Sequence, residues 1–135
     1  GADIVTIQVE STRFPYRALA ILHSLGVKAG LAFNAATSLE AAYPVLDGLD
    51  VIHLMTAEPN GSGAHFMVSM LEKVHQARTL IGDRQIELEV DGGISPENAA
   101  SLVEAGATIL VAGRAIWGEK DPREAVSHLR AAASG

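Results

Sequence analysis

Cysteine is missing from this sequence of 135 residues, and aromatic side chains are scarce, with three Phe, two Tyr and one Trp. Without cysteine there is no disulfide and no thiolate metal site, which fits a reducing cytoplasm. No apolar run approaches the ~20 residues that a membrane-spanning helix needs. Basic runs and stacked aromatic patterns are also missing, and the net charge is −6. We therefore expect neither nucleic acid nor a membrane as a partner.

The apolar content is sufficient for a folded core, since 48% of the residues are hydrophobic and 19% are charged. A chain of this length is most simply one domain. No linker or low-complexity run interrupts it, so we expect residues 1–135 to form a single domain. The chain begins at Gly1 without a methionine, directly before a strand-like segment, and we expect a cut or processed end there.

Strand and helix signals alternate along the chain. Apolar, β-branched runs predict strands over residues 4–9, 29–33, 51–56, 86–90 and 108–112. Helical spacing predicts helices over residues 13–25, 38–46, 66–80, 97–104 and 122–133. Five such βα units in series predict a parallel sheet with right-handed crossovers.

One face of these strands is repeatedly polar, because strand side chains alternate between the two faces. The polar positions include Thr6, Gln8, His53, Glu87, Glu89 and Asp91. In a doubly wound sheet a helix would cover them, at about 1–3 kcal/mol for each unsatisfied polar group. In a barrel they would face the lumen. The pattern favours an α/β fold of the (βα)5 partial TIM-barrel type, with a flavodoxin-like open sheet as the alternative.

A single stretch, residues 86–98, combines a strand, a tight turn and a capped helix. Gly92 and Gly93 let backbone amides approach a ligand closely. Ser95 is a good helix cap, with Pro96 at the first helical position. The stretch places the Asp91 carboxylate and free amides at the carboxyl end of a strand, where α/β proteins usually keep their sites.

Five segments in order resemble the carboxyl-terminal five βα units of the ribulose-phosphate 3-epimerase family, namely residues 1–6, 28–34, 54–56, 88–94 and 111–116. The first three units of that eight-unit barrel have no counterpart in this sequence. The family interconverts D-ribulose 5-phosphate and D-xylulose 5-phosphate through an enediolate, with two aspartates exchanging protons. The resemblance implies a partial barrel of the ribulose-phosphate-binding type, in which Asp91 is a catalytic acid or base.

The same resemblance implies ligands. A divalent metal would bind Asp91, as zinc, manganese or iron, although the missing units would supply the second aspartate and the metal-binding histidines; no metal at all is the alternative. A sugar phosphate or inorganic phosphate would be held by loops after the last three strands, and Met55 would contact the substrate. The implied substrate and phosphate residues are Met55, Gly61, Ser62, Gly63, Gly92, Gly93, Gly113 and Arg114.

Two functions stay open from the sequence. One is a pentose-phosphate isomerase of the 3-epimerase type, and the other is a non-catalytic phosphate-binding or oligomerising half-barrel fragment. His53 is either a metal ligand beside Asp91 and Glu89 or a satisfied interior histidine. Five strands cannot close at the radius where eight do, so two sheet edges would be open. We expect a homodimer that covers these edges, in the cytoplasm.

Overall fold

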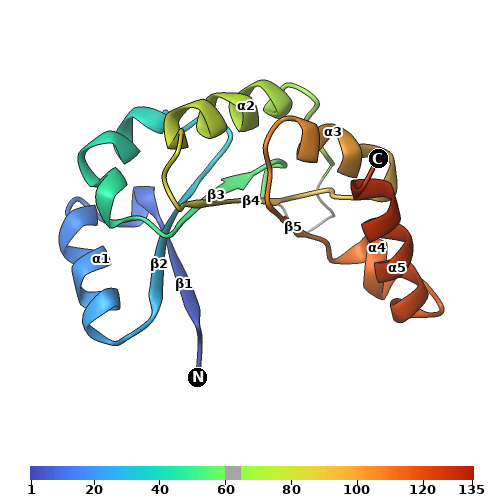
Figure 1. Ribbon diagram of the computed structural model, residues 1–135, viewed down its shortest axis with the longest axis horizontal. Helices are drawn as coiled ribbons and strands as arrows, with labels where there is room; N and C mark the ends of the chain where they lie inside the picture. Colours follow the sequence, from blue (N-terminus) through green and yellow to red (C-terminus); the bar gives the residue numbers. More distant parts are fainter. Residues whose placement is uncertain (60–64) are drawn as a thin grey trace.

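The computed structural model describes residues 1–59 and 65–135 and contains one parallel sheet of five strands (Figure 1). The strands follow one another in the order β1-β2-β3-β4-β5, so each one pairs with the next in sequence. Their bounds are β1 (Ile4–Gln8), β2 (Lys28–Phe33), β3 (Val51–Met55), β4 (Glu87–Asp91) and β5 (Ile109–Val111). A flavodoxin-like sheet would instead place the second strand at its edge, in the order 2-1-3-4-5. The open-sheet alternative is therefore wrong, and the order is that of a partial barrel.

Helical segments form an arc along one side of the sheet, and the opposite side is concave (Figure 1). The arc contains α1 (Pro15–Ser24), η2 (Leu39–Gly48), α2 (Met70–Ile81), α3 (Pro96–Glu104) and α5 (Pro122–Ala133). Two short elements, η1 (Val9–Ser11) and α4 (Arg114–Trp117), follow β1 and β5. This arrangement is the helical outer layer of a barrel wall, with the inner face of the wall left open.

The hydrophobic core lies between the sheet and the helices. Alternate strand residues such as Leu31, Phe33 and Leu54 are fully buried there. From the helices, Val74 and Leu102 complete the same cluster. Because side chains alternate along a strand, this packing sends the intervening polar residues to the concave side. The polar stripe of the sequence therefore lies on the face that the helices do not cover.

The strands lie within one residue of the positions that the sequence predicts, and the helices differ more. The segment expected to form a helix over 66–80 becomes α2 only at Met70, after a turn at residues 68–69. The segment expected over 38–46 is a 3-10 helix, η2, with Pro44 inside it. Proline has no N–H to donate, which disfavours an α-helix at that point. The sequence analysis did not predict η1 or α4.

Within the described residues, no helix has both the length and the apolar character needed to cross a lipid bilayer.

Candidate active site

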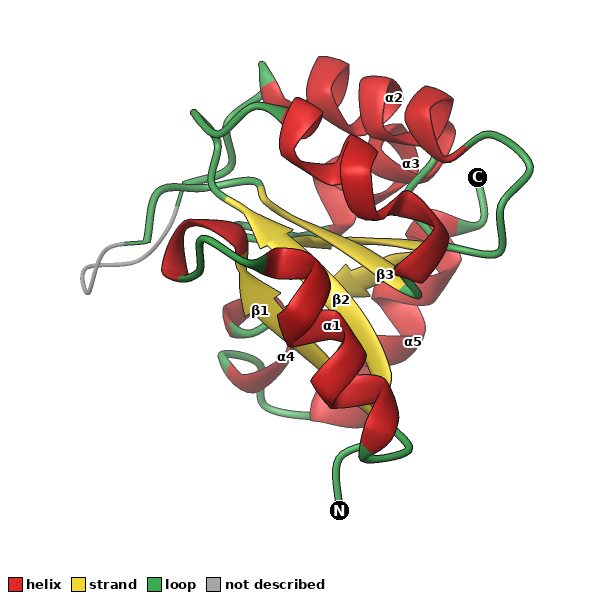
Figure 2. Ribbon diagram, turned by 90° about the vertical axis from the view of Figure 1, so that its left-hand side faces the viewer, coloured by secondary structure: helices red, strands yellow, loops and turns green. Residues whose placement is uncertain are grey.

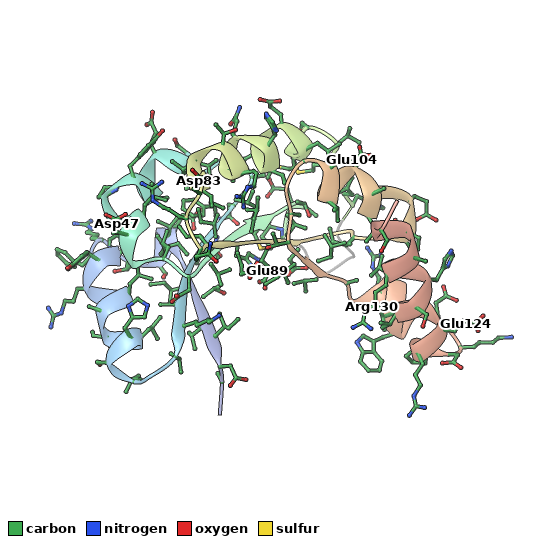
Figure 3. The ribbon with its side chains drawn as sticks, in the orientation of Figure 1. Asp47, Asp83, Glu89, Glu104, Glu124 and Arg130 are labelled. Carbon is green, nitrogen blue, oxygen red and sulfur yellow. The ribbon has the colours of Figure 1, made fainter. Side chains whose placement is uncertain are left out.

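The concave face is organised in rows that strand pairing fixes. Ala32 of β2 pairs with both Gln8 and His53, and His53 pairs with Glu89. Two residues nearer the carboxyl ends of the strands, in the next row on the same face, Met55 pairs with Asp91, and Asp91 pairs with Val111. Glu89 lies beneath β4 in Figure 3, on the side of the sheet away from α2 and α3. These rows put Asp91 in the layer at the mouth of the half-barrel.

A pocket of about 570 Å³ opens beside Asp91, between the loops that follow β3, β4 and β5. It gathers most of the residues expected from the sequence, and its polar lining includes His65, Asp91, Gly92, Gly93, Gly113 and Arg114. Met55 is paired with Asp91 but does not line this pocket. The expected residues Gly61, Ser62 and Gly63 lie outside the described part of the chain. The pocket is thus an acid, a glycine turn and an arginine around one hollow.

The Gly92-Gly93 turn requires glycine for two reasons. Both residues have positive φ angles, +126° and +70°, which side chains disfavour. The turn also lies directly against the loop after β3: a Cβ on Gly93 would be 2.5 Å from the amide nitrogen of Phe66. The loop after β3 and the turn after β4 therefore form one closely packed unit.

Two side chains hold the carbonyl groups of this turn. The hydroxyl of Thr56, which is fully buried, donates to the Gly92 carbonyl oxygen at 2.8 Å. The amide of Asn98 donates to the Gly93 carbonyl oxygen at 2.9 Å, while its own oxygen accepts from the Ser95 amide at 3.0 Å. With both carbonyl oxygens engaged, the turn keeps one fixed orientation.

The amides of Gly93 and Ile94 have no acceptor among the described residues, although both residues line the pocket. Unpaired backbone amides in a glycine turn form a concave site for an anion. Arg114 lines the same pocket, and a guanidinium can bind a phosphate with two parallel hydrogen bonds. The pocket therefore combines donors for an oxyanion with a carboxylate that can exchange a proton.

His53 and Glu89 form a pair one row below Asp91. The Nδ1 atom of His53 lies 2.5 Å from Oε1 of Glu89, and both side chains are largely buried. Glu89 satisfies one ring nitrogen of His53, as expected of an interior histidine, but a metal-binding histidine also commonly donates its second nitrogen to a carboxylate, so the contact fits both alternatives. Among residues 1–59 and 65–135, no three His, Asp or Glu side chains are grouped so as to hold a metal ion. The donor set in this part of the chain does not form a metal shell, and Asp91 would be only one ligand.

Sequence reasoning missed Thr56 and Asn98 as parts of the site. Asn98 could have been predicted, because it stands three residues after Ser95 in a capping-box pattern. Thr56 offered no such signal, since a threonine at a strand end has many uses. A second hollow, of about 1050 Å³, lies between η2 and α2 on the helical side of the sheet and does not include Asp91.

Comparison with known proteins places these features in context. Residues 1–117 match the model of the ribulose-phosphate 3 epimerase family. The chain is 36% identical to the ribulose-phosphate 3-epimerase of Bacillus subtilis over 133 residues, which cover 96% of the chain and 61% of that protein. It is 39% identical to the chloroplastic ribulose-5-phosphate-3-epimerase of Arabidopsis thaliana, covering 97% of the chain and 48% of that protein.

Among solved structures, 3-keto-L-gulonate-6-phosphate decarboxylase from Vibrio cholerae aligns with a TM-score of 0.75 at 22% identity, over 99% of this chain and 62% of that one. At that identity the likeness concerns the fold. The chain spans about half to three fifths of the length of the curated relatives that it matches.

Proposed function

The chain belongs to the ribulose-phosphate 3-epimerase family, and from this premise we propose that it binds a pentose 5-phosphate and takes part in its epimerisation at C3. The observation that carries the proposal is the pocket in which Asp91 directly precedes the Gly92-Gly93 turn and shares the lining with Arg114. Phosphate would bind the turn amides and the guanidinium. The sugar would then extend from that anchor past the Asp91 carboxylate.

Epimerisation at C3 needs a proton removed from one face of the sugar and another returned to the opposite face. In our proposal the Asp91 carboxylate accepts the C3 proton, and the electron pair of the broken C–H bond passes into the enediolate. A second acid must then protonate C3 from the other side. In the described part of the pocket Asp91 is the one carboxylate, so that second acid has to come from elsewhere.

This shortage of acids favours a second candidate function. The chain by itself could bind phosphate or a sugar phosphate without turning it over, as a half-barrel that supplies the phosphate site to a larger assembly. The two candidates share the anion site and differ only in proton transfer. Binding and turnover must therefore be measured separately.

A divalent metal fits this part of the chain poorly. The resemblance to the family implies zinc, manganese or iron at Asp91, but the described residues offer no group of three ligands. His53 could add at most one further ligand through its second ring nitrogen, since its Nδ1 contacts Glu89. Any ion would need ligands from outside these residues, and no step of our proposal passes through a metal.

We also propose that the chain self-associates as a dimer or larger and is located in the cytoplasm. Self-association is supported by the two edge strands, β1 and β5, because unpaired strand edges invite pairing with another chain. The cytoplasmic location is supported by the lack of cysteine, which secreted proteins of this size often use for disulfides.

A coupled epimerase assay on the purified chain with D-ribulose 5-phosphate tests the proposal. We expect Asp91→Asn to lower turnover by at least about 100-fold, the usual contribution of a general acid or base. Asp83→Asn is a suitable control, because Asp83 is exposed between α2 and the amino-terminal end of β4, whereas the pocket lies at the carboxyl end of that strand. Phosphate titration, followed by chemical shifts, reports binding without turnover.

The outcomes separate the candidates. Turnover that Asp91→Asn abolishes supports the epimerase. Phosphate binding without turnover, with or without added zinc or manganese, supports the binding half-barrel. Turnover that is unchanged in Asp91→Asn removes Asp91 from the chemistry, and a chain that neither binds nor turns over contradicts both candidates.

A further inference from the structure

We propose that Asn34 is the residue that hydrogen-bonds the sugar hydroxyls of the bound pentose phosphate, and that Glu10 and Lys73 are positioning residues that hold it in place. This inference rests on the proposed function, because it concerns the part of the same substrate that lies away from the phosphate.

Strand register places Asn34 at the mouth of the half-barrel. Phe33, the last residue of β2, is fully buried toward the helices. Asn34 is the first residue beyond the strand and does not line the pocket beside Asp91, and we infer that the alternation continues and places it on the concave side. Phe33 pairs with Leu54, which puts Asn34 level with Met55. Met55 in turn pairs with Asp91. Asn34 thus belongs to the same layer as the Asp91 carboxylate, which is the proposed proton-transferring group. This layer lies at the carboxyl ends of the parallel strands, three of which are labelled in Figure 2.

Lys73 of α2 reaches the segment that follows β2 and binds three of its carbonyl oxygens. Its Nζ atom lies 2.9 Å from the oxygen of Asn34, 2.9 Å from that of Ala35 and 2.5 Å from that of Thr37. An ammonium group has three donors, so all of them are used. Burial lowers the pKa of Lys73, and the charge of Glu10 opposes that shift. Lys73 is therefore a fixed internal support and not a free cation for a ligand.

Glu10 of η1 holds the same segment from the other side. Its Oε1 atom accepts from the Asn34 amide at 3.3 Å and from the Thr37 hydroxyl. Burial raises the pKa of Glu10, but hydrogen bonds from Thr37 and from backbone amides outweigh it, so the pKa lies below its ordinary value. The group is ionised at neutral pH. Glu10 and Lys73 together fix both backbone groups of Asn34.

The Asn34 side chain takes no part in this clamp. Among the described residues it makes no hydrogen bond, although the residue is half-buried. A carboxamide offers two donors and an acceptor, which suits the hydroxyl groups of a sugar. A polar group whose backbone is held by two charged residues, in the layer of Asp91, has the preorganisation that a ligand-binding side chain needs.

The test compares two ligands on the full chain by calorimetric titration: D-ribulose 5-phosphate and inorganic phosphate. We expect Asn34→Ala to weaken pentose-phosphate binding by about threefold to tenfold, the worth of one or two hydrogen bonds, and to leave phosphate binding unchanged. Gln76→Ala is the matched control, because its amide is exposed on α2 and bonds Glu72.

Lys73→Met tests the positioning role. It should reduce the preference for pentose phosphate as Asn34→Ala does, and the double variant should lose no more than Asn34→Ala alone, because Lys73 acts through Asn34. A merely structural role for Lys73 would weaken both ligands together. Lys73→Arg, which keeps a cation, should recover part of the preference.

An unchanged ratio of the two affinities in Asn34→Ala overturns the inference while leaving the phosphate site intact. So does a wild-type chain that binds pentose phosphate no better than inorganic phosphate. A wild-type chain that binds neither ligand overturns the proposed function, and the inference with it.

Discussion

Asp50 shows how a single residue can join three elements at the amino-terminal end of the sheet. Its Oδ2 atom accepts from the Ala29 amide of β2 at 2.8 Å and lies 2.9 Å from Nε2 of His23, next to the end of α1. Its backbone carbonyl accepts from the Glu87 amide of β4 at 2.9 Å. This end of the sheet lies opposite the pocket, so Asp50 serves stability and not ligand binding.

The Asp50 interactions predict a dependence of stability on pH. Burial raises the pKa of Asp50, but the hydrogen bond from Ala29 and the neighbouring His23 and Lys28 outweigh it, so the folded-state pKa lies below the ordinary value. A carboxyl group with a lowered folded-state pKa stabilises the protein above its unfolded pKa, at about pH 4. That contribution is lost as the pH falls through the lower, folded-state value.

We therefore expect Asp50→Asn to be less stable than the wild type at pH 6 and to lose less of its free energy of unfolding between about pH 4 and pH 2. Urea denaturation across that range measures it. Asp47→Asn is the control, because the Asp47 side chain is 97% exposed and lies 3.5 Å from Arg84. Parallel pH profiles for the wild type and Asp50→Asn would contradict the prediction.

At the scale of the element, the loop after β3 and the turn after β4 depend on each other. Thr56 connects them by two hydrogen bonds, since its amide donates to the Asp91 carbonyl at 2.7 Å and its hydroxyl donates to the Gly92 carbonyl. The orientation of the proposed anion site therefore depends on a residue that does not itself line the pocket.

We expect Thr56→Val to lower the free energy of unfolding by about 1–3 kcal/mol, because the buried Gly92 carbonyl loses its side-chain donor. Phosphate affinity should fall as well, since the turn loses a constraint. Thr79→Val is a matched control: its hydroxyl bonds the His75 carbonyl within α2 and is exposed. Unchanged phosphate affinity in a folded Thr56→Val chain would show that the turn is held by its other contacts.

The elements also show what the sequence can and cannot reveal. Strand positions follow from alternation, and the helix from Pro122 to Ala133 follows from its cap, Asp121, and the proline after it. The residue at which α2 begins and the 3-10 conformation of η2 could not be predicted from the sequence. Packing decides the first, and a single internal proline decides the second. The short η1 and α4 are too brief to carry a periodic signal.

The candidate site divides in the same way. Asp91 and its glycine turn could be predicted from the sequence, because a pair of glycines after a strand indicates a tight turn. Asn34, Glu10 and Lys73 come from three separate parts of the chain, and the role that we propose for them depends on the contacts between those parts. No local sequence pattern predicts such contacts. The grouping of side chains from distant parts of the chain could therefore not be predicted from the sequence alone.

At the scale of the whole molecule, the two edge strands and the concave face are exposed together. Ile4 of β1 is 40% exposed, Val111 of β5 is 37% exposed, and Trp117 just beyond β5 is 77% exposed. Apolar side chains beside unpaired strand edges favour association with another chain.

We expect the purified chain to sediment as a dimer or larger at micromolar concentration, and Ile4→Lys to weaken that association. Val103→Lys is the control, since Val103 is 39% exposed but lies on α3, in the outer layer. A well-folded monomer across the concentration range would contradict the prediction, and equal effects of the two variants would place the contact elsewhere.

The sequential order of the strands has one more consequence. Because every strand neighbours the one before it along the chain, whole βα units can be added or removed at either end without rethreading what remains. Such an architecture is modular, because no unit crosses over another one. Gene duplication, fusion and truncation could therefore lengthen or shorten it in steps of one unit, and each intermediate would keep its internal neighbours.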